Sequence, residues 1–316
     1  MEYTDFRQQE ELERKKLKRC FRTVGIAYAV YLVVSTLSQL AVSLFLQAPD
    51  TKLGWNLWML ASMLAMYPLS TLFLYLIMRR IPKACQTWKE PLGPGRYIGI
   101  FAICMGCMYL GNIIGQAASA VVRIITGMPV DYSLDLLLDN MQPWLILLVV
   151  VITGPVMEEL VFRKILLDRI AGYGQLTSML ISGLIFGVAH GNFYQFFYAF
   201  ALGAVFAWVY LRTGNVFYTI GLHVMINFWG SFLSMYLLDL IEAWGTAGLM
   251  LIFGQLMVMI GFMIAAAILL IYYRKEVFLR EEKKFLSSGR RFLAVMLNAG
   301  MILYLFVGGI LFVMNL

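Results

Sequence analysis

Two adjacent glutamates lie near the end of an otherwise apolar stretch. They occur in the run Gly154-Pro-Val-Met-Glu-Glu-Leu-Val-Phe-Arg163, which places Glu158 and Glu159 side by side. Neighbouring residues on a helix point about 100° apart, so the two carboxylates cannot serve the same task. Glu159 and Arg163 are four residues apart and share a helix face, which predicts a salt bridge. Glu158 then faces a different neighbourhood, and we predict that it is the carboxylate that does chemistry.

The only two histidines of the chain follow in two further polar motifs. His190 ends the run Phe186-Gly-Val-Ala-His190, and His223 begins the run His223-Val-Met-Ile-Asn227. Because His223 and Asn227 are four residues apart, they share a helix face, and the amide can orient the imidazole or donate to an oxyanion. A carboxylate, two imidazoles and an amide are groups that suit peptide hydrolysis, which needs a proton carrier and oxyanion donors.

The nucleophile of such a site has to be an activated water. No serine follows a glycine-rich turn of the kind that presents a nucleophile, and the chain lacks a His-Glu-x-x-His zinc motif. Two routes stay open. In the first, Glu158 and His190 accept the water proton, while His223 and Asn227 stabilise the oxyanion. In the second, Glu158, His190 and His223 bind Zn²⁺ or another divalent metal that acidifies the water.

The elements that position these residues have the composition of membrane helices. The 316 residues are 61% hydrophobic and 14% charged, and their mean hydropathy is +0.78. Apolar runs of about 20 residues, long enough to cross about 30 Å of hydrocarbon, recur along the chain. The sequence predicts an all-α, polytopic transmembrane bundle of about eight or nine spans. The predicted spans are 23–48, 56–78, 97–122, 143–165, 176–193, 194–211, 215–240, 249–273 and 292–315.

The basic residues predict the orientation of the bundle. All lysines and arginines except Lys52 and Arg123 fall in alternate connections, at 1–22, 79–96, 163–175, 212 and 274–291. The positive-inside rule therefore predicts a cytoplasmic N-terminus. The net charge of +7 is then explained by membrane topology and by contact with membrane lipid, not by nucleic-acid binding.

The distribution of charged residues predicts four segments along the chain. Residues 1–22 form a charged cytoplasmic segment, and residues 23–142 form spans one to three with their loops. Residues 143–240 contain nearly all ionisable groups within spans, which marks them as the catalytic core because such groups are costly in hydrocarbon. Residues 241–316 form the C-terminal spans with a basic cytoplasmic hairpin at 274–291.

The three motifs together are a recognisable pattern. Glu-Glu-x-x-x-Arg, Phe-x-x-x-His and His-x-x-x-Asn, in this order, resemble the CAAX-protease and bacteriocin-processing family of intramembrane peptidases. That family includes type II CAAX prenyl endopeptidases and lysostaphin-resistance-like proteins. The resemblance covers about 143–240 and implies a helical membrane fold with a cavity open to the cytoplasm. The last span and its basic hairpin lie outside this pattern, and a membrane-protein partner that binds residues 274–316 is a hypothesis for them.

The resemblance also implies roles for individual residues. It implies that Glu158 activates the water, with Glu159 and Arg163 as its support. His190 would be a partner of that water, and His223 and Asn227 would be oxyanion or ligand groups. Phe186 opens the second motif as a supporting residue. Metal dependence differs between descriptions of the family, so both routes above stay open.

Taken together, the sequence predicts an intramembrane endopeptidase. Its substrate would be a membrane-associated, prenylated or leader peptide, cut from the cytoplasmic side of a bacterial plasma membrane. The alternative is a membrane scaffold or immunity protein that binds a partner enzyme or peptide without proteolysis. A transporter with a proton relay is disfavoured, because the sequence contains no inverted repeat.

Overall fold

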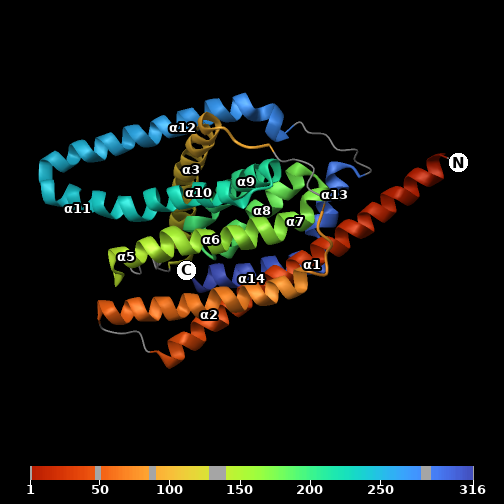
Figure 1. The fold of residues 1–316 in the computed structure, drawn as a ribbon, viewed down its shortest axis with the longest axis horizontal. Helices are drawn as coiled ribbons and strands as arrows, with labels where there is room; N and C mark the ends of the chain where they lie inside the picture. The colour runs from red at the N-terminus through yellow and green to blue at the C-terminus, as the bar shows by residue number, and fades with distance from the viewer. Residues whose placement is uncertain (1, 47–50, 85–89, 128–139, 279–285, 316) are drawn as a thin grey trace.

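The chain folds into a bundle of helices (Figure 1). The computed structural model describes residues 2–46, 51–84, 90–127, 140–278 and 286–315, and these form helices and no strands, which confirms the all-α class. The long helices are α1 (Glu2–Phe45), α2 (Lys52–Met78), α3 (Pro94–Thr126), α9 (Phe193–Thr213) and α12 (Gly248–Phe278). The shorter ones are α5 (Pro143–Ile146), α6 (Gly154–Glu159), α7 (Leu166–Ile170), α8 (Gln175–Ala189), α10 (Val216–Asn227), α11 (Ser234–Trp244), α13 (Ser288–Met296) and α14 (Ala299–Met314).

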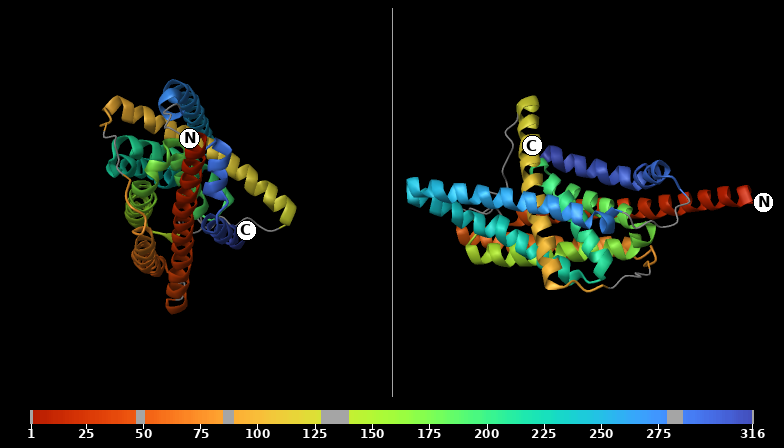
Figure 2. Two further views of the ribbon diagram at one scale, coloured as in Figure 1. Left: turned by 90° about the vertical axis from the view of Figure 1, so that its right-hand side faces the viewer. Right: turned by 90° about the horizontal axis from the view of Figure 1, so that it is seen from above.

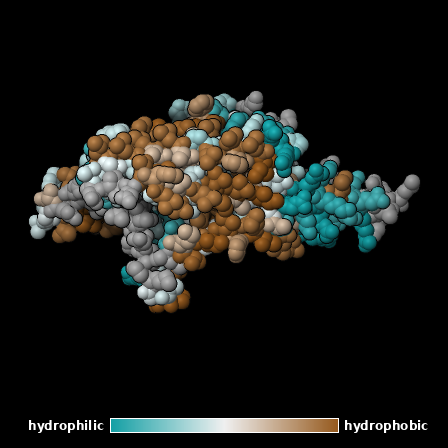
Figure 3. All heavy atoms as spheres, turned by 90° about the horizontal axis from the view of Figure 1, so that it is seen from below, coloured by the Kyte–Doolittle hydropathy of each residue, from teal (hydrophilic) through white to brown (hydrophobic). Residues whose placement is uncertain are grey.

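The helices have the length and apolarity of membrane spans. Over the described ranges, seven helical stretches qualify, and an eighth does if Gly289–Met296 and Ala299–Met314, which meet at 65°, count as one span. The predicted segment 176–193 becomes α8, whose 15 residues are fewer than a full crossing needs. Figure 3 shows a broad hydrophobic surface on the body of the molecule and a hydrophilic N-terminal end. The protein is therefore an integral membrane protein.

The predicted segment boundaries differ from the helix boundaries in two places. The charged residues before position 23 continue without a break into the first span, because α1 is a single helix of 44 residues. Figure 2 shows its N-terminal end projecting beyond the bundle. In the predicted basic hairpin 274–291, α12 continues to Phe278, and residues 279–285 lie outside the described part of the chain.

The helices that carry the motifs are irregular. Between Pro143 and Tyr173 the chain alternates between α-helix and the π-helical segments η1 (Leu147–Thr153) and η2 (Leu160–Ile165), and ends in the 3₁₀ turn η3 (Ala171–Tyr173). A third π segment, η4 (Phe228–Leu233), follows α10 directly, and the 3₁₀ turn η5 (Gly245–Ala247) follows α11. π segments are rare and often occur at functional sites. Here they border both the Glu-Glu motif and the His-x-x-x-Asn motif.

Small residues allow the helices around the motifs to approach closely. A Cβ atom at Gly183 of α8 would lie 2.6 Å from the Phe200 carbonyl oxygen of α9, and one at Gly203 of α9 would lie 2.9 Å from the Gly183 Cα. Such small-residue contacts are typical of helix pairs in membranes. Thus α8 and α9 form a tight hairpin, while α3 crosses α9 and α12 (Figure 2) and α1 packs on α2 and α14.

Candidate active site

A buried ion pair forms the base of the site. The Nε atom of Arg163 lies 3.0 Å from Oε2 of Glu159, and both side chains are fully buried, which confirms the predicted pair. The guanidinium also lies over two aromatic rings, 4.6 Å from the centre of the Phe186 ring and 5.4 Å from that of Phe206. A buried charge needs such partners, because removing a charge from water costs free energy. The Phe186 ring thus lies against the buried cation, and its predicted supporting role stays a prediction.

His223 connects this ion pair to the second glutamate. Its Nδ1 atom lies 3.0 Å from Oε1 of Glu159, and its Nε2 atom lies 3.7 Å from Oε2 of Glu158. Because Glu159 is a carboxylate, the Nδ1–H group donates to it, and this contact fixes the ring orientation. The four side chains therefore form a chain in the order Arg163, Glu159, His223, Glu158, and one imidazole lies between two carboxylates.

Glu158 lies at the outer end of this chain and faces a cavity. The hydroxyl of Tyr67, on α2, lies 3.5 Å from its Oε1 atom, at the long limit of a hydrogen bond. The Glu158 side chain is 24% exposed, whereas that of Glu159 is fully buried. The prediction that the two adjacent carboxylates face different neighbourhoods is confirmed.

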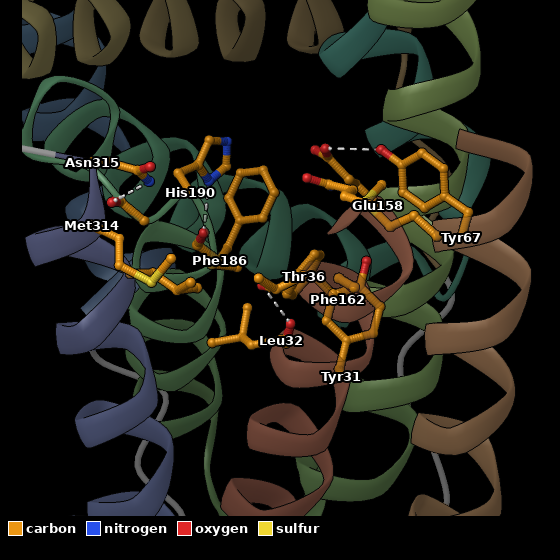
Figure 4. Close-up of a pocket in the computed structure, with 16 residues that line it drawn as sticks. Tyr31, Leu32, Thr36, Tyr67, Glu158, Phe162, Phe186, His190, Met314 and Asn315 are labelled. Carbon is orange, nitrogen blue, oxygen red and sulfur yellow. Dashed lines mark hydrogen bonds between the residues drawn. The ribbon is translucent and has the colours of Figure 1, made fainter. Parts of the chain in front are cut away.

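His190 lies on the same cavity and comes from a different element. It caps the C-terminal end of α8, and its Nδ1 atom lies 2.8 Å from the Phe186 carbonyl oxygen. A carbonyl only accepts, so Nδ1 carries the hydrogen, and Nε2 of the neutral ring is an acceptor. Figure 4 shows Glu158 and His190 on opposite sides of the cavity.

The cavity has a volume of about 300 Å³ and is lined by both polar and apolar side chains. Its walls come from α1, α2, α6, η2, α8 and α14 (Figure 4). The lining residues are Tyr31, Leu32, Ser35, Thr36, Gln39, Met66, Tyr67, Glu158, Phe162, Phe186, Ala189, His190, Gly191, Leu311, Met314 and Asn315. A water and one peptide bond fit a space of this size.

His223 and Asn227 do not belong to this lining. His223 is 5% exposed and lies behind Glu158, and Asn227 donates from Nδ2 to the Val150 carbonyl oxygen at 2.9 Å. Val150 lies in the π segment η1, where backbone carbonyls depart from the α-helical pattern. Asn227 therefore connects α10 to the irregular helix of the Glu-Glu motif. Its predicted role as an oxyanion donor stays a prediction.

The metal-binding route meets a geometric difficulty. Among the described residues, no three His, Cys, Asp or Glu side chains converge closely enough to hold a metal ion. The candidate ligands show why. His223 directs one ring nitrogen at Glu159 and the other at Glu158, and His190 faces Glu158 from across the cavity. The donor set therefore does not fit a metal in this arrangement.

Sequence reasoning missed the tyrosines of the site. Tyr67 and Tyr31 line the cavity beside Glu158, on α2 and α1 respectively. Both lie in apolar spans among many other aromatic residues, and neither belongs to a motif. Only a hydroxyl in the middle of a span could have pointed to them, because such a group needs a partner in hydrocarbon.

Comparisons with known proteins agree with the motifs. Residues 140–229 match the model of the family described as type II CAAX prenyl endopeptidase Rce1-like. A protein of Bacillus subtilis (strain 168), named "Putative membrane peptidase YdiL", is 35% identical over 86 residues, which are 26% of this chain and 34% of that relative. The chain thus spans about a third of the length of that relative. No solved structure matches the chain. The resemblance predicted from three motifs is confirmed: over residues 140–229 the chain is similar to the Rce1-like, type II CAAX prenyl endopeptidases.

Proposed function

We propose that the protein is an intramembrane endopeptidase that hydrolyses a peptide bond with a water activated by Glu158. One observation carries the proposal: Glu158 lies between a cavity and a buried chain of His223, Glu159 and Arg163. A carboxylate in a membrane span is costly and is retained where it has a task. The family match and the similarity to a membrane peptidase support the same activity.

The charges of the four linked side chains suit proton transfer at Glu158. Two carboxylates and one guanidinium leave a net charge of −1, and one proton shared by Glu158 and His223 makes the group neutral. In a medium of low dielectric constant a neutral group is favoured over a charged one. Glu158, with His223 beside it, is therefore placed to receive the water proton, as a general base must be.

The proposed reaction uses one water. Glu158 takes a proton from the water. At the same time the water oxygen bonds to the scissile carbonyl carbon, and the electrons of the C=O double bond move to the carbonyl oxygen. The neutral His190 accepts the second O–H of the water at Nε2 and so orients it. The Tyr67 hydroxyl, close to Oε1 of Glu158, donates to the oxyanion. Glu158 then returns its proton to the leaving amine nitrogen as the C–N bond breaks.

The substrate and its location belong to the same proposal. A peptide tethered to the membrane, by a prenyl group or by an apolar leader, would reach a cavity that lies among membrane helices. We place the protein in a bacterial plasma membrane, with the N-terminus and the site's entrance on the cytoplasmic side.

A substrate panel in proteoliposomes tests the proposal. The panel holds a prenylated CAAX-type peptide, the same peptide without the lipid, and a leader peptide, and new termini are identified by mass spectrometry. We expect cleavage of a membrane-tethered member by the wild type and none by His190→Ala or His223→Ala of equal thermal stability. Wild-type rates in both variants would overturn the proposal, as would a stable partner bound without cleavage of any substrate, which the scaffold alternative predicts.

A further inference from the structure

Helix α14 lies outside the family segment 140–229, yet it contacts the turn that carries His190. We propose that α14 positions His190, and that Asn315 is a positioning residue for it. The inference rests on the proposed function for its chemical meaning, because it concerns the same site. The placement of the His190 ring, however, can be measured without any activity.

Three contacts, in matching order, join α14 and its C-cap residue Asn315 to α8 and the turn after it. The Tyr304 hydroxyl donates to the Ile185 carbonyl oxygen at 2.5 Å. Further along, a Cβ atom at Gly308 would lie only 2.3 Å from Val188 Cγ1, so the two helices touch there. At the end of α14, Asn315 Nδ2 donates to the Gly191 carbonyl oxygen at 3.0 Å. Tyr304 and Gly308 are four residues apart, and Gly308 and Asn315 are seven apart. This spacing places all three on one helix face.

The turn after His190 depends on the last of these contacts. Gly191 has a φ of +67°, a conformation that favours glycine. A Cβ atom there would lie 3.2 Å from both Asn315 Nδ2 and Leu311 Cβ, so α14 encloses the turn. The His190 carbonyl accepts from Asn192 Nδ2 at 2.9 Å, which leaves the Gly191 carbonyl to Asn315. Both carbonyls of the turn therefore have a donor, and one of the two donors comes from α14.

These contacts affect the direction in which the His190 imidazole points. The ring of His190 starts from the last turn of α8 and is held at Nδ1 by Phe186, so a shift of that turn moves Nε2 in the cavity. Leu311, Met314 and Asn315 line the same cavity as His190 (Figure 4). A segment without motifs thus completes the site, and a displacement of about 1 Å of a reacting group can lower a rate about 10²-fold.

Two adjacent glycines give a matched test of this role. Gly308→Ala would push a methyl group against Val188, whose branched side chain cannot rotate away easily in a helix. Gly309→Ala adds the same methyl group where no atom lies within 4 Å. Asn315→Ala removes the hydrogen bond to the turn without adding bulk.

The readout uses the fact that the chain has only two histidines. Histidine-selective isotope labelling of the full chain in detergent micelles gives two imidazole signals, which His190→Gln and His223→Gln assign. We expect Gly308→Ala and Asn315→Ala to shift the His190 signal, to leave that of His223 in place and to lower kcat about 10²-fold. Gly309→Ala should match the wild type in both measurements.

Two outcomes separate this inference from the proposed function. An unmoved His190 signal in both Gly308→Ala and Asn315→Ala overturns the inference, whether or not the protein cleaves peptides. A selective shift of that signal in a protein that cleaves no substrate supports the positioning by α14 and counts against the proposed function alone. Equal shifts of both histidine signals would indicate general loosening and would also overturn the inference.

Discussion

The Nδ1 atom of His223 lies 3.0 Å from Oε1 of Glu159, and the opposite ring nitrogen faces Glu158. One imidazole thus links two neighbouring glutamates of a single helix. The relationship explains why adjacent carboxylates can coexist within a membrane span: Glu159 has a fixed cation, Arg163, and Glu158 has a partner that can hold a proton.

The buried ion pair should dominate stability. Arg163→Met leaves Glu159 as a buried charge without its cation, and breaking such a pair costs about 3–5 kcal/mol. Lys15→Met breaks the exposed pair of Glu11 and Lys15, which has the same spacing and a similar distance of 2.9 Å. We expect a large fall in the thermal unfolding temperature for the first variant and none for the second. Equal unfolding temperatures of Arg163→Met and the wild type would contradict the buried pair.

The Tyr67 hydroxyl should contribute to the rate rather than to binding. Tyr67→Phe removes only an oxygen, and loss of one donor to an oxyanion typically lowers kcat by about 10²–10³. Tyr236→Phe, in which the tyrosine is 42% exposed, is the matched control. Steady-state kinetics should show an unchanged KM in both variants. If Tyr67→Phe raises KM and leaves kcat intact, the hydroxyl binds the substrate instead.

Chelation should leave peptidase activity unchanged. The donor atoms of Glu158, His190 and His223 do not converge on one point, and both nitrogens of His223 face carboxylates. We expect the purified protein to hold no stoichiometric metal and to retain its rate after treatment with EDTA or 1,10-phenanthroline. Loss of activity that Zn²⁺ alone restores would instead establish the metal route.

Labelling at one position before the first span and one after it tests the orientation of the bundle in the membrane. The basic N-terminal part of α1 and the start of α2 should lie on opposite sides of the membrane. In a cysteine-free background, Lys52→Cys should react with a membrane-impermeant maleimide on intact cells, and Lys16→Cys should react only after permeabilisation. The reverse pattern would invert the topology and place the entrance of the site on the other side.

Some features of the fold and of the candidate site could be predicted from the sequence, for physical reasons. Apolar runs predict helices, and the four-residue spacing of Glu159 and Arg163 predicts their ion pair, because both are local properties. The π segments could not be predicted, since an extra residue in a helical turn is fixed by tertiary contacts, such as that between Asn227 and the Val150 carbonyl. Contacts from α14 to α8 join residues 119 and 124 positions apart, which no local pattern reveals.

Replacing the Glu158 carboxylate by an amide tests most directly whether Glu158 activates the water. Glu158→Gln keeps the shape of the side chain but cannot accept the proton, whereas Glu11→Gln makes the same change on an exposed side chain. With both proteins purified in proteoliposomes and shown to unfold at the wild-type temperature, kcat/KM for a tethered peptide is measured. We predict a loss of about 10²–10⁴-fold for Glu158→Gln and none for Glu11→Gln. A wild-type value for Glu158→Gln would contradict the account.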